Sequence, residues 1–121
     1  MAVPNKTAKS FLVFGATNLT AAATTTYTWD LTKAFGGYLT IRIVNQGTGP
    51  TTAPTVTINV SNDNAAWRPQ WKFTGVITAS NTSDWGVEIP AGVMYVQVSI
   101  TAGATTAQGG EVQGHELSNI Y

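Results

Sequence analysis

The chain has 121 residues, of which 43% are hydrophobic and 10% charged, and its six basic and six acidic side chains give a formal net charge of +0. This length suits one domain with one core. The apolar content excludes a disordered chain, which would have few apolar and many charged residues. The basic residues are scattered, so we expect no nucleic-acid partner.

Two further classes of protein are disfavoured by what the chain lacks: those that depend on disulfides or thiols, and those that span a membrane with a helix. There is no cysteine, hence no disulfide and no thiol chemistry. No stretch approaches the roughly 18 apolar residues of a membrane span. We therefore expect a soluble chain that is made in a cytoplasm and has no membrane partner.

The first nine residues show no apolar periodicity and carry two lysines, Lys6 and Lys9. Such a segment has no face to bury, so we expect residues 1–9 to form a flexible arm that orders only against another surface. Strand-like patterns begin at residue 10. They predict a single β-sandwich domain over residues 10–121.

Three segments in the first part of the chain are predicted to be strands. Residues 10–14 form a short apolar run, whereas residues 26–31 and 38–44 alternate between apolar and polar side chains, which is the period of a half-buried strand. Residues 15–25 are small and polar and indicate a loop. In the segment 38–44 the core face would carry Leu39, Ile41 and Ile43, and the other face Tyr38, Thr40 and Arg42.

A loop rich in glycine and proline, residues 45–54, separates this strand from the next alternating segment, residues 55–61. The apolar positions of that segment are Val56, Ile58 and Val60. We expect residues 38–44 and 55–61 to pair as a wide antiparallel hairpin.

The same alternation predicts strands at residues 70–74, 85–89, 93–101 and 111–117. The total is about eight strands with turn signals between them, and helical periodicity is absent. This pattern predicts an all-β fold, a single antiparallel β-sandwich. A jelly-roll and an immunoglobulin-like topology both fit eight strands.

Catalysis needs acid–base groups brought together, and the chain offers only His115 and six carboxylates for this work. His115 and Glu116 are adjacent on a predicted strand, so their side chains point to opposite faces. There is no Gly-x-Ser-x-Gly sequence and no phosphate-binding loop. We expect no enzymatic activity and no cofactor.

The turn that follows residue 61 is dense in oxygen-bearing side chains, from Asn62, Asp63 and Asn64. Such oxygens can coordinate calcium, but the pattern of a calcium-binding EF-hand loop is missing. Asn and Asp side chains also hydrogen-bond their own backbone in turns. We expect a turn closed in this way and no metal.

The tryptophans have three candidate roles: core packing, contact with another subunit, and stacking against a sugar ring. Trp29, Trp71 and Trp85 each share a strand face with aliphatic residues, which favours the core. Trp67 closes the turn, and all three roles stay open for it.

Two segments resemble a known family. Residues 55–67 read Thr-Val-Thr-Ile-Asn-Val-Ser-Asn-Asp-Asn-Ala-Ala-Trp and residues 89–100 read Ile-Pro-Ala-Gly-Val-Met-Tyr-Val-Gln-Val-Ser-Ile. They are similar to the strand, the Ser-Asn-Asp-Gly-x-x-Trp turn and the Ala-Gly-x-x-Tyr-Val-Arg-Val strand of small β-sandwich proteins of tailed-bacteriophage virions. This chain has Asn64 where Gly is usual and Gln97 where Arg is usual. Similar turns occur in extracellular β-sandwich modules that bind carbohydrate.

The resemblance implies a structural virion component that is assembled in the host cytoplasm. The size suits a head decoration, or cement, protein that binds the major capsid protein or other virion subunits, often as a homotrimer. Two alternatives stay open: a carbohydrate-binding module or tail-fibre receptor domain, and a tail or connector subunit. The residues we expect at subunit interfaces are Lys6, Lys9, Phe11, Trp67, Arg68 and Trp71.

Overall fold

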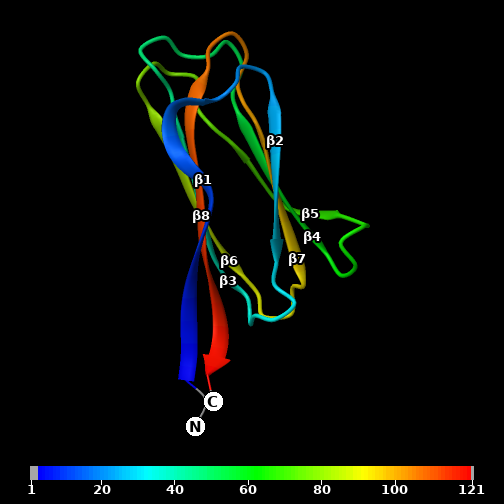
Figure 1. Ribbon diagram of the computed structural model, residues 1–121. Coiled ribbons are helices and arrows are strands. Elements are labelled where there is room, and N and C mark those ends of the chain that lie inside the picture. Colours follow the sequence, from blue (N-terminus) through cyan, green and yellow to red (C-terminus); the bar gives the residue numbers. More distant parts are fainter. Residues whose placement is uncertain (1–2, 121) are drawn as a thin grey trace.

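The computed structural model describes residues 3–120 and the side chains of residues 6–118. Its regular structure consists of eight β-strands (Figure 1). Within residues 3–120, no helix is long and apolar enough to cross a membrane. The strands are β1 (Val3–Leu19), β2 (Thr24–Asp30), β3 (Gly37–Val44), β4 (Thr55–Ser61), β5 (Arg68–Thr74), β6 (Thr82–Ile89), β7 (Tyr95–Thr101) and β8 (Gln108–Ile120).

The strands form two antiparallel four-stranded sheets. The first sheet has the order β1-β8-β3-β6 and the second has the order β2-β7-β4-β5. The pairs β1·β8, β2·β7, β3·β6 and β4·β5 are nested, as if one long hairpin had been wound into two layers. This is the topology of a jelly roll.

The predicted all-β antiparallel sandwich is confirmed, and the strand order selects the jelly roll over the immunoglobulin-like alternative. The predicted hairpin between residues 38–44 and 55–61 is wrong. Strand β3 pairs with β6 and β8, whereas β4 pairs with β5 and β7. The reason is that residues 45–54 carry the chain from one sheet to the other.

The structure also differs from the expected flexible arm at residues 1–9. From Val3 onward this segment belongs to β1 and pairs in unbroken register with the end of β8, from Val3 opposite Ile120 to Ser10 opposite Gln113. Figure 1 shows the two strand ends running together beyond the rest of the molecule. We call residues 3–10 and 113–120 the terminal ribbon. The segment thus orders against the other end of the same chain.

Beyond the terminal ribbon, the second half of β1 is irregular. Its register against β8 shifts between Ser10 and Leu12 and twice more before Leu19. Asn18 closes the gap in the ladder, because its amide nitrogen donates to the Gly110 carbonyl (3.0 Å) and its amide oxygen accepts from the Gly110 N–H (2.7 Å). Such bulges bend an edge strand and turn side chains outward.

The core lies between the sheets and is built from the inward positions of the alternating strands. Its members include Leu39, Ile41 and Ile43 of β3, in agreement with the predicted inward face. At the ribbon end the core is filled by Trp29, whose ring lies over Gly37 and Gly114. The core residues are Leu19, Trp29, Leu31, Leu39, Ile41, Ile43, Val56, Ile58, Val87, Ile89, Val96, Val98, Ile100, Ala102 and Val112.

A buried amide network ties three loops together at the opposite end of the sandwich. The Asn45 amide nitrogen donates to the carbonyls of Val76 and Thr78, both at 2.8 Å. Gln108, which is fully buried, donates to the Asn45 amide oxygen (2.5 Å) and accepts from the Gly103 N–H (2.8 Å). All the polar atoms of this network that need partners have them, as burial requires.

Candidate functional site

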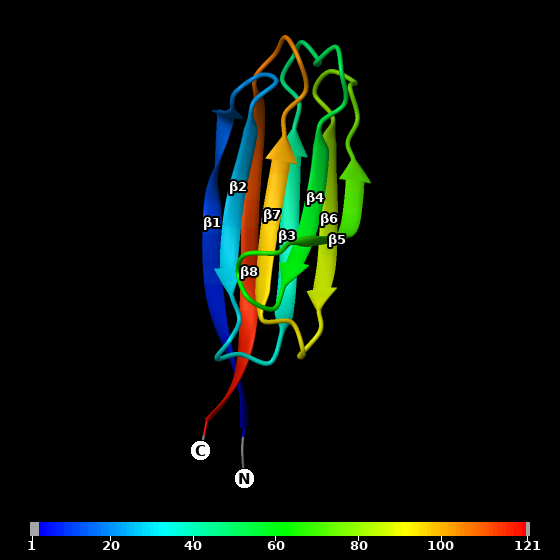
Figure 2. The same cartoon turned by 90° about the vertical axis from the view of Figure 1, so that its right-hand side faces the viewer.

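The six expected interface residues fall into two groups on opposite sides of the molecule. Lys6, Lys9 and Phe11 lie on β1, and Arg68 and Trp71 lie on β5. Strand β1 is one edge of the first sheet and β5 is the opposite edge of the second sheet (Figure 2). The structure does not bring the two groups into one site.

Within the first group the three side chains have different surroundings. Lys6 is exposed, and Lys9 forms an ion pair with Glu116 (3.6 Å). Phe11 packs edge-on against Trp29, with ring centroids 5.5 Å apart. Part of the Phe11 side chain therefore packs against the core. The two lysines are the members of this group that are more available for contact with another subunit.

The second group is divided in the same way. Trp71 faces inward and packs against the core, and the neighbouring Phe73 stacks on Trp85 across the two sheets at 5.5 Å. The core role expected for Trp71 and Trp85 is thus supported. Arg68 is exposed and lines a small hollow of about 160 Å³ beside the turn.

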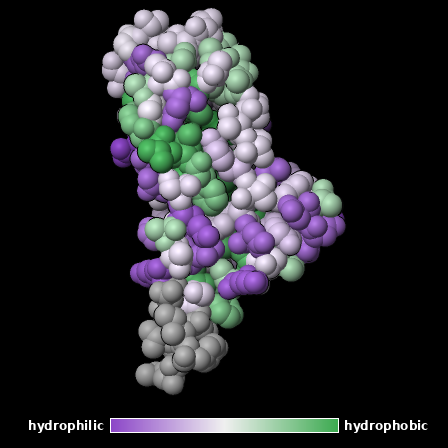
Figure 3. Space-filling view, in the orientation of Figure 1, coloured by the Kyte–Doolittle hydropathy of each residue, from purple (hydrophilic) through white to green (hydrophobic). Residues whose placement is uncertain are grey.

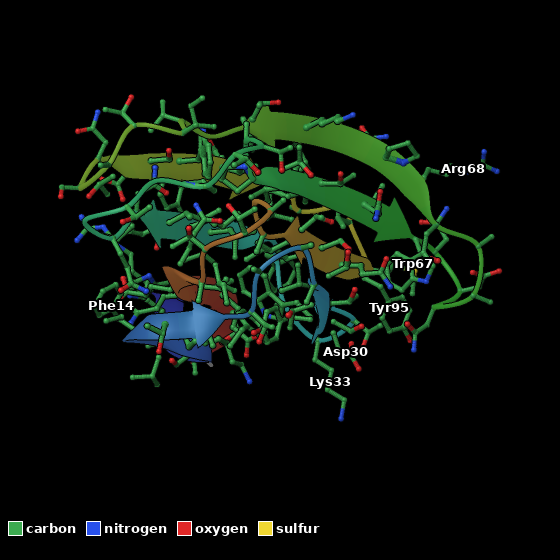
Figure 4. All side chains as sticks on the ribbon, turned by 90° about the horizontal axis from the view of Figure 1, so that it is seen from above. Phe14, Asp30, Lys33, Trp67, Arg68 and Tyr95 are labelled. Atoms are coloured by element: carbon green, nitrogen blue, oxygen red, sulfur yellow. The ribbon has the colours of Figure 1, made fainter. Side chains whose placement is uncertain are left out.

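Trp67 is half-buried and ends the loop between β4 and β5. This loop projects from the side of the second sheet (Figure 1). Figure 4 shows Trp67 on the side of Tyr95, with Arg68 pointing away from the molecule and Phe14 at the far end of the view.

The turn inside this loop is closed by its own side chains. One oxygen of Asp63 accepts from the Ser61 hydroxyl and from the N–H groups of Ala65 and Ala66, each at 2.9 Å. These bonds favour the ionised carboxylate and hold the pKa of Asp63 below its ordinary value of 3.8. Asn64 adopts a left-handed backbone (φ 59°), which explains why glycine suits this position in the resembling turn.

The expectation of a self-bonded turn is therefore confirmed. Across the part of the chain whose placement is described, no three His, Asp or Glu side chains gather in a way that could hold a metal ion.

The outer face of the second sheet is polar, and its side chains largely satisfy one another. Facing residues on β2 and β7 bond through their hydroxyls, Thr24 with Thr101 at 2.8 Å and Thr26 with Ser99 at 3.2 Å. Asn59 of β4 donates to the side-chain amide oxygen of Gln97 of β7 (3.2 Å). Such paired groups have fewer free donors and acceptors to offer a ligand.

The free edge of β1 carries an exposed apolar pair. Val13 is 73% exposed and Phe14 is 44% exposed, and both follow the first register shift. Figure 3 shows hydrophobic colour gathered over this part of β1 on an otherwise mostly polar surface. An apolar pair on an edge strand is unusual, because such edges are normally protected by charge or by short length.

The outer face of the first sheet holds a second feature, centred on Tyr38. This side chain is 49% exposed and lies over Gly86 of β6, where an added Cβ would be 2.1 Å from the tyrosine hydroxyl. On one side of Tyr38 is a hollow of about 400 Å³, whose polar lining includes Arg42, Asp84 and Glu111.

On the other side of Tyr38 is a hollow of about 290 Å³. Its lining includes Lys6, Glu88 and His115. Tyr38 thus separates two adjoining hollows on one sheet face.

The Tyr38 hollows were not identified as a site from the sequence. The alternation in residues 38–44 correctly placed Tyr38 and Arg42 on the outer face. What it did not provide was the register that sets Arg42 opposite Asp84 and Thr40 opposite Gly86. The signal for Tyr38 was its aromatic ring on an outward strand position.

No family model and no curated protein sequence matches the chain. Among solved structures it is similar to the K3 cleaved adhesin domain of Lys-gingipain from Porphyromonas gingivalis w83, with a TM-score of 0.50 and 14% identity over 77% of this chain and 62% of that domain. It is also similar to a Bacillus endospore appendage pilus subunit (TM-score 0.46, 16% identity, 99% of this chain and 89% of that chain).

A third similar structure is the CBM36-1 domain of a multidomain xylanase from the hindgut metagenome of Trinervitermes trinervoides, with a TM-score of 0.44 and 11% identity over 97% of this chain and 99% of that domain. At 14% identity, the similarity to the adhesin domain shows a common fold and nothing more. The two lower scores add no argument about function.

Proposed function

We propose that this chain is a non-enzymatic structural subunit of a tailed-phage virion, a head decoration protein that binds the major capsid protein and stabilises the shell. The sequence resemblance of residues 55–67 and 89–100 supports this proposal. The observation that carries it is the free edge of β1, which joins an unbroken ribbon to an exposed apolar pair.

The terminal ribbon supports a docking role by its position. Strand β3 meets β8 only as far as Glu116, so the last residues of β8 have β1 as their strand partner. Beyond Glu116 the terminal ribbon therefore has only two strands, and a two-stranded ribbon is at best marginally stable in water by itself. Its unpaired backbone groups and exposed lysines would gain hydrogen bonds and ion pairs from a neighbouring subunit.

The apolar pair supplies the other part of the docking surface. Val13 and Phe14 are exposed in the single chain, and their burial on assembly would stabilise the contact by about 25 cal/mol per Å² of apolar area before association costs. Assembly as a homotrimer would bring three such edges to the capsid. The virion, assembled in the host cytoplasm, is the location that follows from this role.

The test is binding to phage heads that lack the chain, measured by co-sedimentation of purified protein. Wild-type protein is expected to bind, and the double variant Val13→Asp/Phe14→Asp to bind at least about tenfold more weakly. The matched control is Val76→Asp/Ile77→Asp, which changes two similarly exposed apolar residues in the β5–β6 loop. The control is expected to bind like wild type.

Two results would overturn the proposal. One is a wild-type protein that stays monomeric and does not bind heads. The other is a six- or twelvefold ring in electron micrographs together with binding to tails, which would identify a tail or connector subunit instead. The position of the gene is a cheaper first check, because a neighbouring major capsid gene favours decoration.

A further inference from the structure

We propose that the outer face of the first sheet binds a neutral saccharide, with Tyr38 as the stacking platform between the two hollows. This goes beyond the proposed structural role and uses a surface other than the free edge of β1.

The first step is the shape of the platform. Gly86 leaves the space that the hydroxyl end of Tyr38 occupies, so the tyrosine lies across β6 instead of standing away from the sheet. About half of its surface stays open to solvent. An aromatic ring held in this way offers an apolar surface to the C–H face of a sugar ring and a hydroxyl to its polar edge.

The second step is the space beside the platform. The hollows of about 400 and 290 Å³ adjoin at Tyr38. Together they fall within the range of small-molecule sites, about 300–1,000 Å³. The site therefore suits a short oligosaccharide with sugar rings on both sides of the tyrosine.

The third step is the polar lining, which carries both signs of charge. Arg42 donates to both carboxylate oxygens of Asp84, at 2.7 and 3.4 Å, and lies opposite Glu111 on β8. An ion pair this exposed adds little to stability. Its remaining donors and acceptors are suited to the hydroxyl groups of a sugar, each of which both donates and accepts.

The charges also argue against other ligands. In the first hollow two carboxylates, Asp84 and Glu111, outnumber the single cation Arg42, so this hollow would repel phosphate or an acidic sugar, whereas in the second hollow Lys6 offsets Glu88. The hollow beside the β4–β5 turn, which Arg68 lines, is the competing location, but it is smaller, about 160 Å³, and one carboxylate oxygen of Asp63 in its lining is already used by the turn. The neutral saccharide at Tyr38 is the combination that these observations favour.

The experiment is a titration of the ¹⁵N-labelled full chain with neutral trisaccharides (xylotriose, cellotriose, maltotriose and chitotriose), followed by amide chemical shifts. We expect at least one of them to shift signals of β3 and β6 around Tyr38. Tyr38→Ala is expected to weaken this binding at least about tenfold, and Tyr38→Phe to retain most of it because the ring remains. Sialyllactose is expected to bind more weakly than the best neutral sugar.

Trp67→Ala serves as the matched control, and its binding is expected to equal that of wild type. The amide spectrum of each variant reports whether it has folded. Gly86→Val provides a second test of the Tyr38 platform, because the valine side chain fills the position over which Tyr38 lies. The proposal is overturned if none of the four sugars shifts β3 and β6, or if Trp67→Ala removes binding while folded Tyr38→Ala retains it.

Discussion

At the scale of single residues, packing around Trp29 shows how little room the core leaves. A Cβ on Gly114 would stand 2.9 Å from the Trp29 ring and 3.3 Å from the carbonyl of Tyr38. Neither the indole nor the backbone of β3 can move freely, because the ring also lies over Gly37 and packs against Phe11. A glycine is therefore needed at position 114 for steric reasons.

Gly114→Ala is expected to lower the free energy of unfolding by about 1–3 kcal/mol, the usual effect of overpacking a filled core. Urea unfolding followed by tryptophan fluorescence measures it. Gly92→Ala is the matched control, since an added Cβ there meets nothing within 4 Å, and we expect it to stay within about 0.5 kcal/mol of wild type. Equal effects of the two changes would contradict this account of the packing.

At the scale of elements, the β4–β5 turn links protonation to stability. The pKa of Asp63 is lowered by its bonds from the N–H groups of Ala66 and Ala65 and from the Ser61 hydroxyl. Asp30 has a lowered pKa for a similar reason, because it accepts from the hydroxyl and N–H of Thr32. Each carboxylate stabilises the fold above its ordinary pKa of 3.8, and this contribution is lost as the pH falls through the lowered value.

We therefore expect Asp63→Asn to be less stable than wild type at pH 7 and the difference to shrink as the pH is lowered towards about 2. Thermal unfolding of both proteins across this range measures the difference. A gap that stays constant with pH would show that the Asp63 charge has no part in closing the turn.

The elements also show what the sequence could and could not predict. Alternation located the inner strands, because residues such as Leu39 and Ile41 face a core on every second position. It missed both ends of β1, because the side chains of residues 6–10 are all exposed and the bulges after Ser10 break the period of two. The strands that pair with β3 could not be predicted, because a period of two shows which way a side chain points and does not show which strand lies alongside.

The same limit applies to the candidate site. That Tyr38 points outward follows from its strand. That it lies over Gly86, between two hollows, depends on pairing with a strand more than 40 residues away. The expected interface residues were chosen for their chemistry, and the fold separates them onto opposite edges, a feature of nested pairing that no local pattern contains.

At the scale of the whole molecule, the buried network of Asn45 and Gln108 joins the β3–β4, β5–β6 and β7–β8 connections at one end of the sandwich. Loops of this length would otherwise move independently. Inside the protein, these side-chain amides form hydrogen bonds with each other and with backbone groups in place of bonds with water. Removing one amide therefore leaves a buried polar group without a hydrogen-bond partner.

Asn45→Ala is expected to lower the free energy of unfolding by about 2–4 kcal/mol, since it leaves Gln108 and two carbonyls without their partner. Asn59→Ala is the control: its amide bonds Gln97 on the outer face, where water can replace it, and we expect less than about 1 kcal/mol. Urea unfolding of the two variants and of wild type measures both losses of unfolding free energy. Similar losses would show that burial of the network contributes little.

The nested pairing of the jelly roll has a consequence for the order of folding. The pair β4·β5 closes only the short loop of residues 62–67, whereas β1·β8 joins the two ends of the chain. Closing a long loop has a larger entropic barrier, so pairs are expected to form from β4·β5 outward, with β1·β8 last. The ribbon that we propose for docking would then exist only in chains that have completed every earlier pair, and a half-folded subunit would have no edge with which to join a particle.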